Sequence, residues 1–140
     1  MTDILKLVRI QILLIILFVV FKFIRPAVLN NGFPQWIKIT LLSLPNFFEA
    51  FIGTLILTGI GLYLNLRILS RKRQIKRNLI YVIAPILAGI YVITQELKLH
   101  NLGGNNVYDS NDIVFSVIGL ITGYLIVILI KPRIYHVVEE

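Results

Sequence analysis

The chain has 140 residues, of which 57% are hydrophobic and 15% charged, and its mean hydropathy is +0.85. Soluble domains contain about 45–50% apolar and about 25% charged residues, so this composition argues against a soluble globular protein and favours a membrane protein. The lack of cysteine excludes disulfides, lipoprotein attachment and thiolate metal sites, whereas the net charge of +7 admits either nucleic acid or an anionic membrane surface as a partner.

The first predicted element is a membrane span over residues 4–24. Its centre reads ILLIILFVVF, and Lys6, Arg9 and Lys22 lie near its ends, where long basic side chains reach the lipid headgroups. A helix crosses the hydrocarbon core in about 20 residues, which this segment provides. The sequence KFIRP follows where a cleavable signal peptide would have small residues, so we expect the span to be retained.

The segment between the first two spans, residues 25–44, contains Phe33, Trp36 and Lys38. Tryptophan is enriched at membrane–water interfaces, so we expect this segment to lie on the outer surface of the bilayer. Its polar residues do not line up on one helical face, and the sequence therefore leaves its secondary structure open.

Three further apolar segments predict spans over residues 46–69, 78–95 and 112–130. Backbone groups in lipid are best satisfied within helices, so we predict an all-α integral membrane protein with four transmembrane helices in a single domain, residues 1–140. A soluble helical bundle is the alternative, but it requires polar faces that most of the first span lacks. Pro85 predicts a kink in the third span.

The distribution of basic residues predicts the orientation of the spans. The loop between the second and third spans carries six cations, namely Arg67, Arg71, Lys72, Arg73, Lys76 and Arg77. Cytoplasmic loops are rich in Lys and Arg, so this loop is predicted to lie inside, and both termini with it (N-in, C-in). Ten of the 14 basic residues are then inside, where the net charge is +7, against zero outside. We attribute this excess to topology and to anionic lipid, and we expect no nucleic-acid partner.

Small and weakly polar residues form a stripe along each of the last three spans. The stripes are Ala50, Thr54, Thr58, Gly61 and Asn65 on the second span, Tyr81, Ala84, Ala88, Tyr91 and Gln95 on the third, and Asp112, Ser116, Gly119 and Gly123 on the fourth. Such residues favour helix contacts in lipid, so we expect spans two to four to form the packed core and span one to face lipid. The G-x-x-x-G pair of span four also permits homodimerisation through that face.

Several polar groups are expected to converge on the outer side. Asp109 is predicted to be the N-cap of the fourth span, and Asp112 to occupy its third helical position and reach back as in a capping box. Glu96 lies near the end of the third span, where the helix dipole disfavours a negative charge, and His100 follows one helical turn later. The loop NLGGNN contains two glycines that let it turn sharply and bring these groups into one pocket.

This pocket admits three kinds of chemistry. Three carboxylates and an imidazole can bind a divalent cation, but their spacing matches no dedicated metal motif, so we expect neither a metal nor another cofactor. Glu96 or Asp112 can act as a catalytic general base, although no nucleophile motif accompanies them. The same groups can bind a cationic or polyhydroxylated envelope molecule. Glu49, at the outer start of the second span, is interpreted as an interfacial acid paired with a nearby Lys or Arg.

Residues 78–126 resemble the VanZ-like family of small multi-span membrane proteins. The resemblance rests on Gln95-Glu96, Tyr108-Asp109, Asp112, Ser116, Gly119 and Gly123. The chain departs from the family pattern at Ser116 and Asn106, where the family usually has Asn and Arg, and in the adjacency of Gln95 and Glu96, which the family spaces three apart. The family takes its name from a factor associated with resistance to the glycopeptide teicoplanin, so the resemblance implies envelope modification or envelope-linked resistance.

The sequence therefore predicts a VanZ-like protein of the bacterial cytoplasmic (inner) membrane whose outer acidic pocket engages an envelope precursor or glycolipid, with membrane lipids as general partners. The expected binding residues are Gln95, Glu96, His100, Asp109, Asp112 and Ser116, and the expected helix-packing residues are Thr54, Thr58, Gly61, Gly119 and Gly123. A non-catalytic role is favoured. The alternatives are a small intramembrane enzyme acting on a lipid-linked substrate and an accessory subunit that packs through the Gly119/Gly123 face in a larger complex.

Overall fold

The computed structural model describes residues 3–97 and 109–134 of the chain. Its helices are α1 (Asp3–Asn30), α2 (Gln35–Arg67), α3 (Arg77–Glu96) and α4 (Ser110–Ile130), with a short 3₁₀ turn η1 (Arg71–Arg73) between α2 and α3. Each of these four α-helices is long and apolar enough to cross a membrane. The prediction of an all-α protein with four such helices is confirmed for the described part of the chain.

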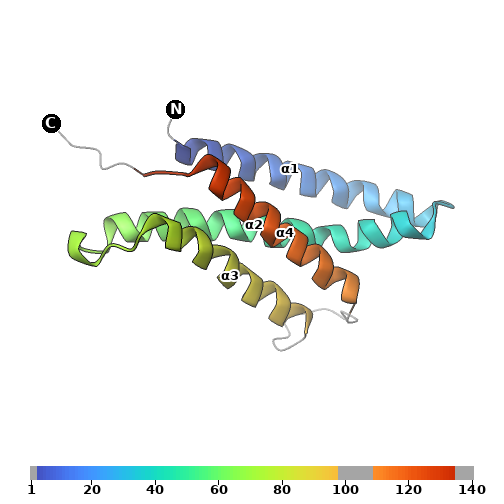
Figure 1. Ribbon diagram of the computed structural model, residues 1–140. Coiled ribbons are helices and arrows are strands. Elements are labelled where there is room, and N and C mark those ends of the chain that lie inside the picture. Colours follow the sequence, from blue (N-terminus) through green and yellow to red (C-terminus); the bar gives the residue numbers. More distant parts are fainter. Residues whose placement is uncertain (1–2, 98–108, 135–140) are drawn as a thin grey trace.

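The segment between the first two spans is mostly helical. α1 continues through Pro26 to Asn30, and α2 begins at Gln35, well before residue 46. Pro26 in α1 and Pro45 in α2 do not end their helices. Each lacks only one backbone donor, and the neighbouring residues continue the helix. Instead of a separate stretch along the bilayer surface, residues 25–44 form the ends of two long helices and the tight link between them, and this hairpin extends beyond the start of α4 (Figure 1).

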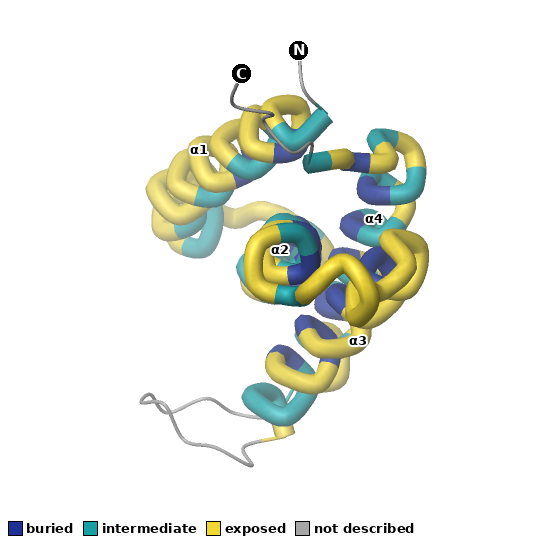
Figure 2. The backbone as a smooth tube through the Cα atoms, turned by 90° about the vertical axis from the view of Figure 1, so that its left-hand side faces the viewer, coloured by how far each residue is buried: buried dark blue, intermediate teal, exposed yellow. Residues whose placement is uncertain are grey.

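Helix α2 is the centre of the bundle. It packs against α1, α3 and α4, and a view along the bundle shows it surrounded by these three helices (Figure 2). Its buried residues run its whole length: Ser43, Phe48, Ala50, Phe51, Thr54, Leu55, Thr58, Leu62 and Asn65. The stripe of small residues predicted on this helix is therefore part of its buried face.

The most extensive helix contact joins α2 and α4, which run in the same direction. A methyl group built on Gly119 would overlap the backbone oxygen of Phe47, and one built on Gly123 would lie 2.9 Å from Cβ of Thr54. Only glycine allows the two backbones to approach this closely. The G-x-x-x-G face of α4 is thus filled by α2 of the same chain, and it is not free for homodimerisation or for an accessory partner.

Helix α3 runs antiparallel to α2 and also contacts α4. Cβ atoms at Gly53 and Ala88 would lie 3.8 Å apart, and one on Gly61 would come within 2.8 Å of Cγ2 of Ile80. On the other side, a Cβ on Gly89 would lie 3.0 Å from Leu120. Helices α2, α3 and α4 therefore contact one another in pairs, as expected. Of the stripe predicted on α3, Tyr81, Ala84 and Ala88 are buried, whereas Tyr91 is 53% exposed.

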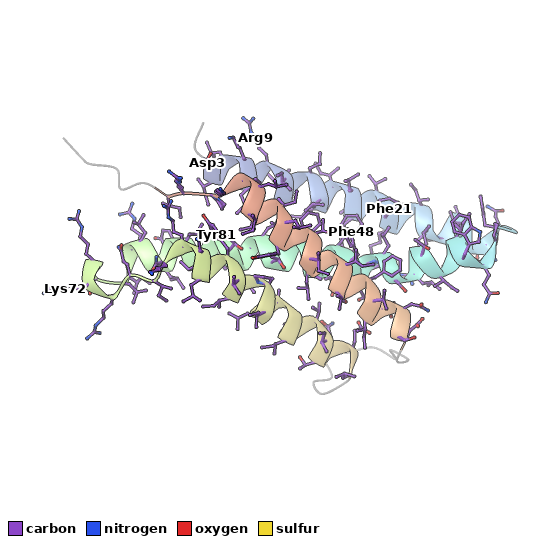
Figure 3. All side chains as sticks on the ribbon, in the orientation of Figure 1. Asp3, Arg9, Phe21, Phe48, Lys72 and Tyr81 are labelled. Carbon is purple, nitrogen blue, oxygen red and sulfur yellow. The ribbon has the colours of Figure 1, made fainter. Side chains whose placement is uncertain are left out.

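Helix α1 does more than face lipid. Leu7 and Leu14 are only 1% and 6% exposed, and the rings of Phe18 and Phe21 lie 5.7 and 5.8 Å from that of Phe48 on α2 (Figure 3). These α1 residues recur at spacings of seven, four and three, which places them on one helical face. The expectation that the first span lies wholly against lipid is wrong for this face, because large apolar side chains pack well without small residues. The rest of α1 is largely exposed (Figure 2).

Candidate functional site

Asp109 and Asp112 stand at the start of α4. Oδ1 of Asp109 accepts hydrogen bonds from the backbone N–H of Asn111, at 2.9 Å, and from its side-chain amide, at 3.0 Å. Asp109 is therefore the N-cap of α4, which confirms the predicted capping role. The predicted capping box does not form, since the side chain of Asp112 makes no hydrogen bond to a described residue. Its carboxylate is left for other interactions.

The carboxylates at this end of the bundle come from three helices. Glu96 ends α3, and the charges of Asp112, Glu49 and Asp109 are close enough to act on it. Within the described residues the one ion pair is between Lys6 and Asp3, so none of these four acids is paired with a described cation. We call Glu49, Glu96, Asp109 and Asp112 the acidic cluster. Its geometry favours binding of positive or hydroxyl-rich groups, because like charges so arranged repel one another unless a ligand compensates them.

The acidic cluster is spread out. Across residues 3–97 and 109–134, no three carboxylate or histidine side chains are close enough together to hold a metal ion. His100, which the sequence adds to this site, lies outside the described residues. The arrangement therefore suits a ligand with several polar groups better than a single small cation.

A groove of about 640 Å³ runs along the bundle between α1, α2 and α3, and one member of the acidic cluster, Glu49, lines it. Most of its lining is apolar, including Phe18, Ile52 and Leu87, and its polar lining consists of Glu49, Tyr91 and Gln95. The side-chain oxygen Oε1 of Gln95 is buried and accepts no hydrogen bond from a described residue. A groove with an apolar wall and polar groups near one end has the character of a site for an amphiphile.

Glu49 lines the groove, which sequence reasoning did not foresee. It was interpreted as an interfacial acid paired with a nearby Lys or Arg; among the described residues it has no ion-pair partner, and Lys98 lies outside them. The signal was present in the register of α2, because Glu49 and Gly53 are one turn apart and both line the groove, while Ala50 and Thr54 are buried. One face of α2 therefore lines the groove, while the neighbouring face is buried against other helices.

Ser116 is buried in a helix contact. It is 0% exposed, on the same stripe of α4 as Gly119 and Gly123, and its hydroxyl has no hydrogen-bond partner among the described residues. Its side chain is therefore closed off from solvent, unlike the partly exposed Asp112. Asp112 lies one turn before Ser116, near the open end of the helix, where it is partly exposed.

The threonines of α2 are satisfied within their own helix. The hydroxyl of Thr54 donates to the backbone oxygen of Ala50 at 2.9 Å, and that of Thr58 donates to the oxygen of Thr54 at 2.8 Å. Both residues are 0% exposed. They lie at helix contacts and present no free polar group to a ligand.

The buried, unpartnered hydroxyl of Ser116 yields a prediction. Ser116→Ala is expected to leave the unfolding temperature unchanged or to raise stability by up to about 1 kcal/mol, because a buried hydroxyl without a partner costs free energy. Thr58→Val, which removes a hydroxyl that does donate, is expected to lower stability by about 1 kcal/mol. Thermal unfolding of the two detergent-solubilised variants compares them directly. A clear loss of stability in Ser116→Ala would contradict the structural description of this contact.

No general base at this end is arranged with a nucleophile. Among the described residues, no serine or threonine hydroxyl donates a hydrogen bond to Glu96 or Asp112, and the chain has no cysteine. Nucleophilic catalysis usually shows the nucleophile within hydrogen-bond reach of its base. The described geometry therefore adds nothing in favour of the enzyme alternative.

Comparison with known proteins adds no relative. No protein-family model, no curated protein and no solved structure matches the chain.

Proposed function

We propose that this chain is a multi-pass membrane protein of the VanZ-like kind that binds an envelope lipid or lipid-linked envelope precursor. The ligand's apolar chain lies in the groove between α1, α2 and α3, and its cationic or hydroxyl-rich headgroup lies on the acidic cluster. The proposed location is the bacterial cytoplasmic membrane, with the acidic cluster on the outer side and both termini inside.

One observation carries this proposal. Four carboxylates from α2, α3 and α4 lie at the same end of the bundle, the charges of the other three act on Glu96, and none has a described cation to pair with. Acids that only stabilise a helix end do not need this arrangement, since Asp109 alone already caps α4. Acidic charge with no counter-ion among the described residues, at the same end as an apolar groove, is the pattern expected where a charged headgroup completes the site.

The orientation is supported by the position of the basic residues. The start of α1, the end of α2, turn η1 and the end of α4 lie at one end of the bundle, opposite the acidic cluster (Figure 1). Six of the chain's cations are found between residues 67 and 77 at that end. Cytoplasmic loops are enriched in such residues, so the acidic end is proposed to face outward.

The test uses a headgroup that separates amine from hydroxyl recognition. The probe is glucosaminyl diacylglycerol, which carries an amine, several hydroxyls and no phosphate, and its partner is glucosyl diacylglycerol, which lacks only the amine. Binding to the purified protein is measured in phosphatidylcholine nanodiscs. We expect the amine-bearing lipid to bind more tightly, because its charge meets the acidic cluster.

Two variants decide the outcome. Glu96→Gln combined with Asp112→Asn is expected to weaken binding of the amine-bearing lipid by about tenfold and to remove its advantage over the hydroxyl-only lipid. Asp3→Asn, which removes a carboxylate from the opposite end of the bundle, is the control and is expected to change binding less than about twofold. Equal binding by the wild-type protein and the double variant, with both correctly folded, would reject the proposed function.

A further inference from the structure

A second cavity lies at the opposite end of the bundle from the acidic cluster. It has a volume of about 430 Å³ and is bounded by the inner end of α2, the segment before α3 and the segment that follows α4. The residues that line it are Leu62, Asn65, Leu66, Gln74, Ile75, Lys76, Arg77, Arg133 and Ile134. Three of these are cations, and none of these described lining residues is an acid. We call it the basic cavity.

The first wall of the basic cavity is held in place by Asn65. Its side-chain amide donates to the backbone oxygen of Ile75 at 2.9 Å, and its side-chain oxygen accepts from the backbone N–H of Ile75 at 2.7 Å. Asn65 is itself 9% exposed. This two-point contact fixes the chain immediately before Lys76 and Arg77, so their positions do not depend on a free loop.

The second wall is held by the end of α4. Lys131 adopts a left-handed conformation with φ of 48° and closes the helix by donating its N–H to the oxygen of Val127 at 2.8 Å. The chain then turns, and the hydroxyl of Tyr81 on α3 donates to the backbone oxygen of the fully buried Pro132 at 2.8 Å. Arg133 follows directly, and the charges of both Arg133 and Arg77 act on Tyr81, which is labelled in Figure 3.

The charges of the basic cavity are uncompensated within the described chain. Among the described acids, Asp3 is the one whose charge acts on Tyr81, and its carboxylate pairs with Lys6 at 3.4 Å. In addition, no side chain caps the N-terminus of α3, so the free backbone N–H groups at Arg77 and Asn78 add to the positive potential. Two guanidinium groups, an ammonium group and an open helix start together match the oxygens of a phosphate.

We propose that the basic cavity binds the phosphate of an anionic phospholipid from the surrounding leaflet. A lipid is favoured over a free phosphate ion because four of the lining residues are aliphatic, namely Leu62, Leu66, Ile75 and Ile134. These side chains can receive the glycerol and the first methylene groups of an acyl chain, while the cations bind the phosphate. The inference is independent of the ligand proposed for the acidic cluster.

The experiment compares two pairs of arginines. The protein is purified in a phosphatidylcholine background, and retention of added phosphatidylglycerol is measured by native mass spectrometry and by the shift in unfolding temperature. Arg77→Gln combined with Arg133→Gln is expected to reduce retention by about tenfold, because each loses a charge-assisted contact. The control, Arg71→Gln combined with Arg73→Gln, removes the same charge from exposed η1 residues that do not line the cavity and is expected to change retention less than about twofold.

The other outcomes overturn the proposal. If both double variants lose retention equally, the lipid is held by general surface charge and the cavity has no special role. If inorganic phosphate raises the unfolding temperature as much as phosphatidylglycerol does, the cavity takes a free anion and the lipid assignment is wrong. All four arginines are exposed, so the variants should fold, and an unchanged gel-filtration profile in detergent checks this.

Discussion

Gly119→Ala is expected to destabilise the protein by about 2–3 kcal/mol, and Gly119→Leu is expected to abolish the folded, monodisperse species in detergent. The added methyl group would overlap the backbone oxygen of Phe47, which cannot rotate away as a side chain can. The only relief is to move α4 away from α2, along the most extensive helix contact of the bundle. Thermal unfolding and gel filtration of the purified variants measure both effects.

Other glycines provide graded controls for this prediction. Gly123→Ala should cost less, because its new methyl group meets Cβ of Thr54 at 2.9 Å and not a backbone atom. Gly59→Ala has nothing within 4 Å and should be neutral or stabilising by up to about 1 kcal/mol, since alanine favours a helix. If Gly119→Ala were as harmless as Gly59→Ala, the parallel contact between α2 and α4 would be disproved.

Cysteine labelling is expected to give an all-or-none answer on orientation. Ser110→Cys, at the exposed start of α4, should react with a membrane-impermeant maleimide in intact cells. Ser70→Cys, which is exposed next to η1, should react only after the membrane is permeabilised. The natural chain contains no cysteine, so each signal comes from one position.

The reverse labelling pattern would carry a definite consequence. If Ser70→Cys reacted in intact cells and Ser110→Cys did not, the acidic cluster would face the cytoplasm. The proposed envelope ligand would then be on the wrong side of the membrane, whereas the contacts within the bundle would be unaffected. Orientation and packing are thus tested separately.

The helices were predictable from the sequence because lipid imposes a simple rule on the backbone. Any long apolar run must be helical there, so all four spans could be identified from composition alone. The limits of the helices could not be predicted in this way, because Trp36, Lys38 and Pro45 interrupt the apolar pattern although all three lie inside α2. The packing of α1 was also missed, since Leu14 and Phe18 look the same in sequence whether they face lipid or another helix.

The site was only partly predictable for a related reason. Asp109 could be assigned as an N-cap from local sequence, because capping depends on neighbours in the chain. Whether Glu49 lines the groove and whether Ser116 is buried depend on how α2 is rotated against α3 and α4, which is a property of the assembled bundle. A pattern read along one helix cannot distinguish a side chain in a groove from one in a helix contact.

The unequal lengths of the helices have a consequence for the surrounding lipid. At 1.5 Å per residue, α2 with 33 residues is about 50 Å long, whereas α3 and α4 with 20 and 21 residues are each about 30 Å, close to the hydrocarbon thickness of a typical bilayer. Hydrophobic mismatch therefore falls on the α1–α2 hairpin, which must tilt or protrude where the shorter helices fit. Because α3 and α4 are packed against α2, a thicker membrane would let the whole bundle stand more upright.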